Sequence, residues 1–308
     1  FQDKLYILNP QMMKNLLYLL IFIPIAGLGQ ELYNIPDNNF LDYLQENYPE
    51  VIVNDSLDTD AAMEVLNISC DSNNINNLDG IQYFINLTTL SCSNNQLITL
   101  PNLPSGLTSL ICGNNQLTSL PDLPETLSSL ICANNQIASL PTLPEELYNL
   151  VCGSNLLFNI PELPSSIVNL ICRNNLLTIL PELPEGLLYL ICGNNQLTIL
   201  PELPSTLLDL TCRNNELTSL PDLPNQLTNL LMDNNPIICV NDYPSIFEEL
   251  LGEFPTCDEI VGLYEVKYNT PHLIKMIDVL GREQEKKNKG MLLFYIYDNG
   301  TVVKRIFH

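Results

Sequence analysis

Residues 107–126 read LTSLICGNNQLTSLPDLPET, and the segments on either side repeat this pattern of leucine, cysteine, asparagine and proline. Aligned on Cys92, seven copies follow one another from residue 87 to residue 226 at a spacing of twenty residues. An eighth, degenerate copy begins at Leu227, and the residues from Val65 onward fit the same frame at a spacing of 22. About nine units therefore occupy residues 65–245, and a repeat of this period indicates a solenoid of stacked coils.

The apolar positions within one unit predict how its coil is built. Side chains alternate along a short strand, so Leu110 and Cys112 face inward and Ile111 faces outward. The other inward leucines of this coil are Leu107, Leu117, Leu120 and Leu123. One coil cannot bury these side chains by itself, but a stack of coils can. Pro121 and Pro124 predict an extended segment on the outer side, because proline cannot donate a backbone hydrogen bond to a helix or a central strand.

At these positions the sequence resembles the leucine-rich repeat family. The LxxLxLxxNxL core is present with cysteine in place of the third leucine, and the LPxLPxx half is similar to the short repeats of secreted bacterial leucine-rich-repeat proteins and effectors. The resemblance implies an α+β repeat fold: a solenoid with parallel strands on its concave face and extended segments on its convex face, between an N-terminal helical cap and a small C-terminal β tail. It also implies that one recurring asparagine bonds backbone groups of each turn. These residues are Asn95, Asn115, Asn135, Asn155, Asn175, Asn195, Asn215 and Asn235.

Cysteine recurs at one position of the coil, from Cys92 to Cys212, and Cys70 precedes this series. One interpretation is a ladder of thiolates that binds metal or changes redox state. The strand alternation favours another, in which the cysteines are small core residues, because free cysteine is among the most buried residue types. Zinc requires four tetrahedral ligands, which side chains projecting in parallel from adjacent strands do not provide. We therefore expect no metal, no cofactor and no disulfide within the ladder.

Two further cysteines, Cys239 and Cys257, lie outside the repeat frame, around a helix expected from about Ser245 to Phe254. An exported protein can keep a disulfide, and closing this 18-residue loop would contribute about 3 kcal/mol by the loop-entropy account. We predict that these two cysteines form a disulfide that covers the last coil.

Residues 30–64 are expected to cover the first coil. They predict an amphipathic helix from about Asp37 to Asn47, followed by a strand-like segment. Four nearby acids could suggest a calcium loop; they are Asp55, Asp58, Asp60 and Glu64. Their spacing lacks the alternating ligands and central glycine of an EF-hand, which favours solvated carboxylates of the cap.

The outward positions of the strands form columns along the concave face. The middle column is rich in aliphatic side chains: Ile111, Ile131, Val151, Ile171 and Ile191. An exposed apolar stripe suggests a partner-binding surface, although β-branched residues also suit strands in the absence of any ligand. Tyr189, Arg173 and Arg213 are the expected anchors, because interfaces are rich in tyrosine and arginine. The convex side carries a row of acids: Asp122, Glu162, Glu182, Glu202 and Asp222.

Charge narrows the class of function. The chain has 308 residues, 35 acids and 12 bases, which give a formal net charge of −23. Residues 31–257 hold 27 acids and two bases, a net of −25, so nucleic acid is not an expected partner. The two histidines are His272 and His308, which excludes a histidine-based triad from the repeats. No carboxylate pair or phosphate loop occurs at a credible spacing, and we expect no catalysis.

The N-terminal residues resemble an export signal. Residues 1–11 are interpreted as leader upstream of a start at Met12 or Met13, and thirteen mostly apolar residues run from Leu16 to Leu28. This stretch is too short to span a bilayer and fits a secretory signal peptide, cleaved before Gln30. A buried N-terminal helix is the alternative. No cysteine follows the cleavage position, so we do not expect a lipoprotein.

The C-terminal residues differ from the repeats in composition and charge. Strands are predicted at Leu273–Leu280, Met291–Tyr297 and Val302–Phe307, with Asn299-Gly300 as the turn between the last two. This region resembles the sorting domain of type IX secretion substrates. The matching motif residues include Asp278, Leu280, Gly281, Arg282, Tyr297, Gly300 and Lys304. The resemblance implies recognition by outer-membrane secretion machinery; a small capping sheet is the alternative.

These features predict a leader and signal peptide (1–29), an N-terminal cap (30–64), the solenoid (65–245), a C-terminal cap and linker (246–261) and a sorting domain (262–308). The expected function is a secreted or surface-displayed, non-enzymatic module whose concave face binds a protein or glycan. A structural or adhesion component that self-associates is a second hypothesis. A hydrolase or a thiol ladder that stores metal is a third.

Overall fold

The computed structural model describes residues 31–252, 254–257, 273–278, 282, 292–297 and 302–306. The predicted signal peptide and the motif residues Leu280, Gly281 and Gly300 lie outside these ranges. The predicted domain boundaries stay predictions.

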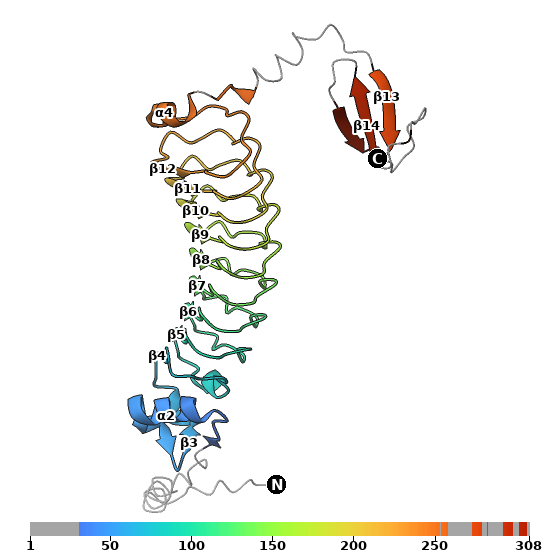
Figure 1. Ribbon diagram of the computed structural model, residues 1–308. Coiled ribbons are helices and arrows are strands. Elements are labelled where there is room, and N and C mark those ends of the chain that lie inside the picture. Colours follow the sequence, from blue (N-terminus) through green and yellow to red (C-terminus); the bar gives the residue numbers. More distant parts are fainter. Residues whose placement is uncertain are drawn as a thin grey trace, which may run out of the picture.

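A parallel sheet of nine short strands runs along one side of the repeats, with each strand beside its neighbours in chain order (Figure 1). Equivalent residues are paired; Leu90 lies opposite Leu110, and Leu110 opposite Leu130. The strands are β4 (Asn67–Ser69), β5 (Thr89–Ser91), β6 (Ser109–Ile111), β7 (Ser129–Ile131), β8 (Asn149–Val151), β9 (Asn169–Ile171), β10 (Tyr189–Ile191), β11 (Asp209–Thr211) and β12 (Asn229–Leu231). The solenoid fold and its parallel strands are therefore as the repeat predicts.

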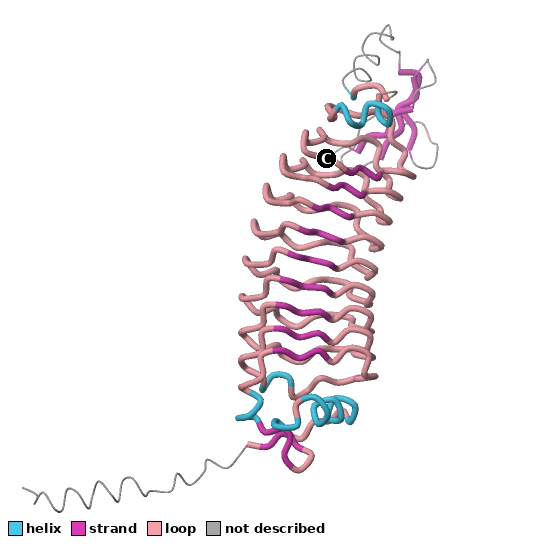
Figure 2. The backbone as a smooth tube through the Cα atoms, turned by 90° about the vertical axis from the view of Figure 1, so that its left-hand side faces the viewer, coloured by secondary structure: helices cyan, strands magenta, loops and turns pink. Residues whose placement is uncertain are grey.

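The core lies inside the stack of coils. In the coil of β6, Leu107, Leu110, Cys112 and Leu117 are fully buried, and the equivalent residues of the neighbouring coils are buried as well. The remainder of each coil between residues 87 and 226 is loop and turn, so the helices of the described residues lie toward the two ends (Figure 2). Each coil thus shelters the apolar side chains of the next, which explains why the units need one another.

Each coil turns directly after its strand at a residue with left-handed backbone. Asn114 has a φ of 54°, and the equivalent residue in eight other coils has a φ near this value. Those residues are Asn74, Asn94, Asn134, Ser154, Asn174, Asn194, Asn214 and Asn234. Asparagine tolerates this conformation better than most residues, which explains why the first residue of the Asn-Asn pair recurs.

A small cap covers the first strand of the sheet. It contains β1 (Leu32–Tyr33), α2 (Asn38–Asn47), a 3₁₀ turn (Pro49–Val51), β2 (Ile52–Val53), β3 (Ser56–Asp58) and α3 (Thr59–Ala62). A second 3₁₀ turn, at Ile81–Tyr83, lies in the first coil, between β4 and β5. The predicted first helix is confirmed, and Asp37 is its N-cap. One carboxylate oxygen of Asp37 accepts from Phe40 N, and the other accepts from the backbone N–H groups of Asn76 and Asn77. Asp37 therefore caps the helix and fastens it to the first coil.

Two of the four acids considered as a calcium loop bond other groups of the cap. Asp58 caps α3 by accepting from the N–H groups of Asp60 and Ala61, and Asp55 accepts from the Gln45 amide. Among the described residues, no group of three or more histidine, cysteine or acidic side chains could hold a metal ion. The arrangement favours the interpretation of these acids as cap residues.

The last coil is closed by a shorter helix than the sequence predicts. A 3₁₀ turn at Ser245–Phe247 leads into α4 (Glu248–Leu251). The predicted helix end at Phe254 is wrong, because the chain turns at Gly252 and Phe254 N donates to Leu251 O. Phe247 and Leu251 are buried against the core, so this single turn already covers the apolar end of the stack.

The predicted cysteine pair is bonded in the structure. Cys239 and Cys257 form a disulfide, with their Cα atoms 4.9 Å apart. Beside it, Val240 N donates to Pro255 O and Cys257 N donates to Val240 O. The disulfide holds residues 254–257 against the last coil.

The C-terminal region contains a separate antiparallel sheet of three strands. They are β13 (Leu273–Asp278), β14 (Leu292–Tyr297) and β15 (Val302–Ile306), with β14 in the middle. The three predicted strands are confirmed, with ends one or two residues shorter. The predicted Asn299-Gly300 turn lies outside the described residues.

Candidate binding face of the solenoid

The outward side chains of the nine strands form one surface, which we call the strand face. Ile111, Ile131, Val151, Ile171 and Ile191 follow one another on it and are each half-buried. The stripe is therefore less open than the sequence suggests, because each aliphatic side chain is shielded by its neighbours in the column. It forms the floor of the strand face.

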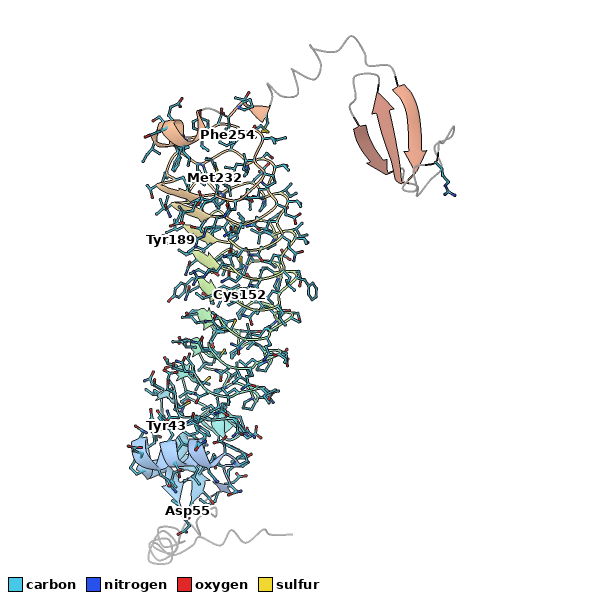
Figure 3. The ribbon with its side chains drawn as sticks, in the orientation of Figure 1. Tyr43, Asp55, Cys152, Tyr189, Met232 and Phe254 are labelled. Atoms are coloured by element: carbon cyan, nitrogen blue, oxygen red, sulfur yellow. A yellow bond between two sulfur atoms is a disulfide. The ribbon has the colours of Figure 1, made fainter. Side chains whose placement is uncertain are left out.

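A hollow of about 420 Å³ opens on the strand face, over three consecutive coils. Tyr148 from the coil of β8 and Tyr189 from β10 are both exposed and line it. Figure 3 shows Tyr189 on the strand side of the solenoid. The full lining is Tyr148, Asn149, Val168, Asn169, Ile171, Tyr189 and Ile191. The hollow combines two tyrosine rings with an aliphatic floor, which is the composition typical of an interface centre.

The two asparagines in the hollow are already hydrogen-bonded. Asn169 Nδ2 donates to Asn149 Oδ1 at 2.6 Å, and Asn149 Nδ2 donates to Ser129 Oγ at 2.9 Å. These bonds fix the side chains on a rigid sheet. The hollow is thereby preformed, which lowers the entropy lost when a ligand binds.

Of the expected anchors, Tyr189 lines the hollow, and Arg173 and Arg213 lie exposed in a neighbouring column of the strand face. Tyr148, Asn149, Val168 and Asn169 were not among the expected residues. Tyr148 is the residue before its strand, and strict alternation would place it on the same side as the buried Leu150, so the alternation gave no signal for it. The column that contains it also holds Val168, Leu188 and Leu208.

The recurring asparagines hold neighbouring coils together behind the strand face. Asn115 Nδ2 donates to the carbonyls of Cys92 and Cys112, while its Oδ1 accepts from Leu97 N at 3.0 Å. Asn135 repeats this pattern one coil later. Each side chain therefore bonds backbone of its own coil and of the preceding one. They make the strand face rigid but do not contact a ligand site.

The eight ladder cysteines are free thiols, and all are buried. Burial raises the pKa of Cys132 and of Cys172 from 9.0 to about 12. Burial and the neighbouring Cys132 raise the pKa of Cys112 well above its ordinary value. The thiols are thus protonated at neutral pH, whereas metal binding and nucleophilic chemistry require the thiolate.

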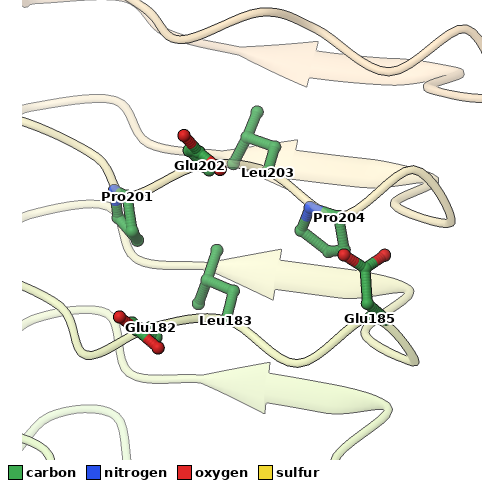
Figure 4. Close-up of a pocket in the computed structure, with 7 residues that line it drawn as sticks. All are labelled: Glu182, Leu183, Glu185, Pro201, Glu202, Leu203 and Pro204. Carbon is green, nitrogen blue, oxygen red and sulfur yellow. The ribbon is translucent and has the colours of Figure 1, made fainter.

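The opposite side of the coils carries shallow acidic grooves. One groove of about 530 Å³ lies between two neighbouring LPxLP segments, with Leu183 and Leu203 between the glutamates (Figure 4). The predicted row of convex acids is exposed throughout: Asp122, Glu162, Glu182, Glu202 and Asp222. These grooves are a periodic consequence of the proline segments.

A third surface carries exposed apolar side chains at the turn beyond the asparagines. Its residues are Leu156, Phe158, Leu176, Ile179 and Ile199. We call it the lateral patch. Other coils have glutamine or threonine at two of these positions, as in Gln116 and Thr118. The sequence signal for the lateral patch was this departure from the consensus within three consecutive units.

Comparison with known proteins supports the fold. A family model described as leucine-rich repeats (2 copies) matches residues 85–125, whereas no curated protein sequence matches the chain. The functional domain of InlJ from Listeria monocytogenes, described as including a cysteine ladder, is 24% identical with a TM-score of 0.59, covering 69% of this chain and 52% of that one.

Two YopM structures are also similar to this chain. YopM from Yersinia enterocolitica WA-314 is 36% identical with a TM-score of 0.48, covering 52% of this chain and 40% of that one. YopM from Yersinia pestis is 30% identical with a TM-score of 0.49, covering 57% and 55%. The chain spans about half the length of the structures it matches. By its repeats and its parallel-strand solenoid, the chain has the leucine-rich repeat fold, and the matching family model places leucine-rich repeats at residues 85–125.

Proposed function

We propose that this protein is an exported, non-enzymatic binding module whose strand face holds a protein partner. The observation that carries the proposal is the hollow between Tyr148 and Tyr189 on a rigid, aliphatic-floored sheet. Interface hot spots concentrate in aromatic side chains at preformed pockets. A glycan is the alternative ligand for the same face.

Export is supported by the resemblance of residues 1–29 to a signal peptide and by the type IX sorting motif around Asp278, Arg282 and Lys304. The bonded pair Cys239–Cys257 is compatible with an oxidising compartment. No helix in the described residues is long and apolar enough to cross a membrane. Deleting residues 262–308 should retain the protein inside the cell, and unchanged export would contradict the sorting role.

The binding role is tested by pull-down from the medium and surface fraction of the producing cells. Tyr148→Ser and Tyr189→Ser should each reduce recovery of the partner at least tenfold, because each removes one wall of the hollow. Ile98→Ser is the matched control, since Ile98 is also exposed but lies off the strand face. Equal recovery by all three variants would contradict the proposal.

A second candidate function is self-association of a structural or adhesive surface component, and the lateral patch favours it. Adjacent coils are joined there by the bond from Leu176 N to Leu157 O, so Leu156 and Leu176 are stacked neighbours. Contiguous exposed apolar side chains mark interaction sites. Leu156→Gln and Phe158→Thr restore residues that other coils carry. If the patch joins two copies, these changes should abolish concentration-dependent sedimentation; a monomer at all concentrations excludes this function.

A further inference from the structure

Arg173 and Arg213 are the only basic residues between positions 31 and 257, a range that holds 27 acids. Both lie on the strand face, exposed, in one column that also contains Gly153 and Gly193. Within the described residues, neither guanidinium has a hydrogen bond or ion pair. Two unpaired cations on one face of a strongly acidic solenoid are a potential anion site.

The glycines shape this column around the arginines. A Cβ atom placed on Gly153 would lie 3.2 Å from Cγ of Arg173, and one on Gly193 would lie 3.3 Å from Cγ of Arg213. The arginine stems therefore lie over bare backbone of the preceding coil. The two arginines are two coil spacings apart, so their Cα atoms are about 10 Å apart. The coil between them has Gly193 at the equivalent position and therefore no side chain there.

Two acidic residues lie near Arg213, and the carboxylate of one of them, Asp209, is already hydrogen-bonded to other side chains. The carboxylate of Asp209 accepts from Thr211 Oγ1 and from Asn229 Nδ2. Asp233 follows Arg213 in the same column, whereas the column neighbours of Arg173 are both glycines. Arg173 is therefore the stronger anion site of the two.

The arginine column lies beside the tyrosine hollow. Tyr189 begins β10 and Gly193 lies two residues beyond its end, so the two are four residues apart, which is about 13 Å of extended chain. Ile171 and Ile191 lie between the two ends and line the hollow. A ligand that lies along the strands can thus place an apolar group between the tyrosines and an anionic group at the arginines.

The lining of the hollow favours a peptide over an acidic sugar. Its walls and floor are tyrosine, valine and isoleucine, and the amides of Asn149 and Asn169 bond one another and Ser129. Sugar hydroxyls need hydrogen-bonding partners, whereas an aromatic or aliphatic side chain needs apolar contact. Carboxylates of aspartate or glutamate match the guanidinium fork.

We propose that the strand face recognises an extended acidic peptide segment of the partner protein. An apolar side chain of the segment occupies the hollow between Tyr148 and Tyr189, and carboxylates three to four residues away bind Arg173 and Arg213. This inference rests on the proposed function and specifies the chemistry of the partner.

The test measures fluorescence anisotropy of labelled peptides with the full chain. One peptide carries a single phenylalanine followed, at the third and fourth positions, by two glutamates in a glycine-serine background; the others replace both glutamates by glutamine or move them to the seventh and eighth positions. The first peptide should bind about tenfold more tightly than either of the others. Equal affinities, or no measurable binding of any peptide, would overturn the inference.

Protein variants assign the effect to the arginine column. Arg173→Met keeps the stem and removes the charge, and should abolish the preference for glutamate over glutamine. Gly153→Ala should weaken glutamate binding by displacing the Arg173 stem. Gly113→Ala is the matched control, because its added Cβ meets the same backbone position at 3.1 Å but faces Ala133 in place of arginine. Equal effects of the two alanine variants would contradict the role of Arg173.

Two outcomes separate this inference from the proposed function. If oligogalacturonate binds in a Tyr189- and Arg173-dependent way while the peptides do not, the ligand is an acidic glycan and the peptide inference is overturned. If Tyr189→Ser abolishes partner recovery while Arg173→Met leaves it unchanged, the proposed function stands and this inference fails.

Discussion

At the scale of single residues, the recurring asparagines do more for the stack than any other polar group. The Asn135 side chain is buried and accepts from Leu117 N while donating to the carbonyls of Cys112 and Cys132. Removing the amide leaves the buried Leu117 N–H without its partner, whereas the carbonyls of Cys112 and Cys132 each keep one bond, from Asn115 and from Asn155.

Asn135→Ala should therefore lower the free energy of unfolding by about 1–3 kcal/mol, because leaving one buried backbone donor without a partner costs about that much. Urea unfolding followed by circular dichroism measures the change. Gln136→Ala is the control, since Gln136 is the exposed next residue, and should change stability by less than about 0.5 kcal/mol. Similar losses in the two variants would show that the ladder contributes little.

Ser154 is the exception among the nine equivalent turn residues, which are otherwise asparagine, and it has a φ of 56°. Asparagine adopts this conformation with less strain than serine. In later coils the equivalent asparagines bond one another, as in Asn214 Nδ2 to Asn194 Oδ1 at 2.6 Å. Ser154→Asn should stabilise the protein by about 0.5–1 kcal/mol, seen as a higher urea midpoint. Ser119→Asn, at an exposed position without positive φ, should have no such effect; a midpoint unchanged by Ser154→Asn would contradict the strain argument.

At the scale of elements, the strands were predictable because two independent signals agree. The twenty-residue period places one strand in each unit, and the alternation of side chains predicts which of its residues face inward. The same reasoning could not assign the helix end near Gly252, because a degenerate segment offers no second copy to fix its phase. It also overestimated the exposure of the aliphatic stripe. Ile131 faces outward, but Ile111 and Val151 lie beside it on adjacent strands, and only stacking in three dimensions shows how much they cover.

The cysteine ladder gives the stack a pH dependence. The thiols of Cys132 and Cys172 have their pKa raised from 9.0 to about 12 by burial. The unfolded chain therefore loses these protons at lower pH than the folded one. The part of the free energy of unfolding that comes from these two thiols is fully present below pH 9 and is lost as the pH rises from 9 toward 12.

At pH 10 the ionisation of each of these thiols in the unfolded chain should lower the free energy of unfolding by about 1.4 kcal/mol relative to pH 7. The double variant Cys132→Ala, Cys172→Ala should consequently lose about 3 kcal/mol less than the unchanged protein between these two pH values. Urea unfolding at pH 7, 8, 9 and 10 measures the difference. Parallel pH profiles for the two proteins would show that the thiols do not ionise on unfolding.

At the scale of the whole molecule, the solenoid presents three surfaces of different chemistry: the strand face, the lateral patch and the acidic grooves. The sequence predicted the outward columns of the strand face and the row of convex acids, because each follows a fixed position of the repeat unit, whereas it did not predict the grooves or the lateral patch. It predicted Tyr189, Arg173 and Arg213 as anchors, but the hollow depends on two tyrosines at different positions of coils two units apart. Tyr148 and Tyr189 are 41 residues apart in the chain, so a comparison of residues at a spacing of twenty does not pair them.

The central claim is that partners bind the strand face, and site-specific photocrosslinking from three surfaces of three consecutive coils tests it most directly. A photoreactive phenylalanine analogue is placed at Tyr189 on the strand face, at Phe158 in the lateral patch or at Glu182 in an acidic groove, in three otherwise identical proteins. The account predicts a discrete crosslinked partner from position 189 that Tyr148→Ser removes, and none from position 182. A partner crosslinked only from position 158 or 182 would contradict it.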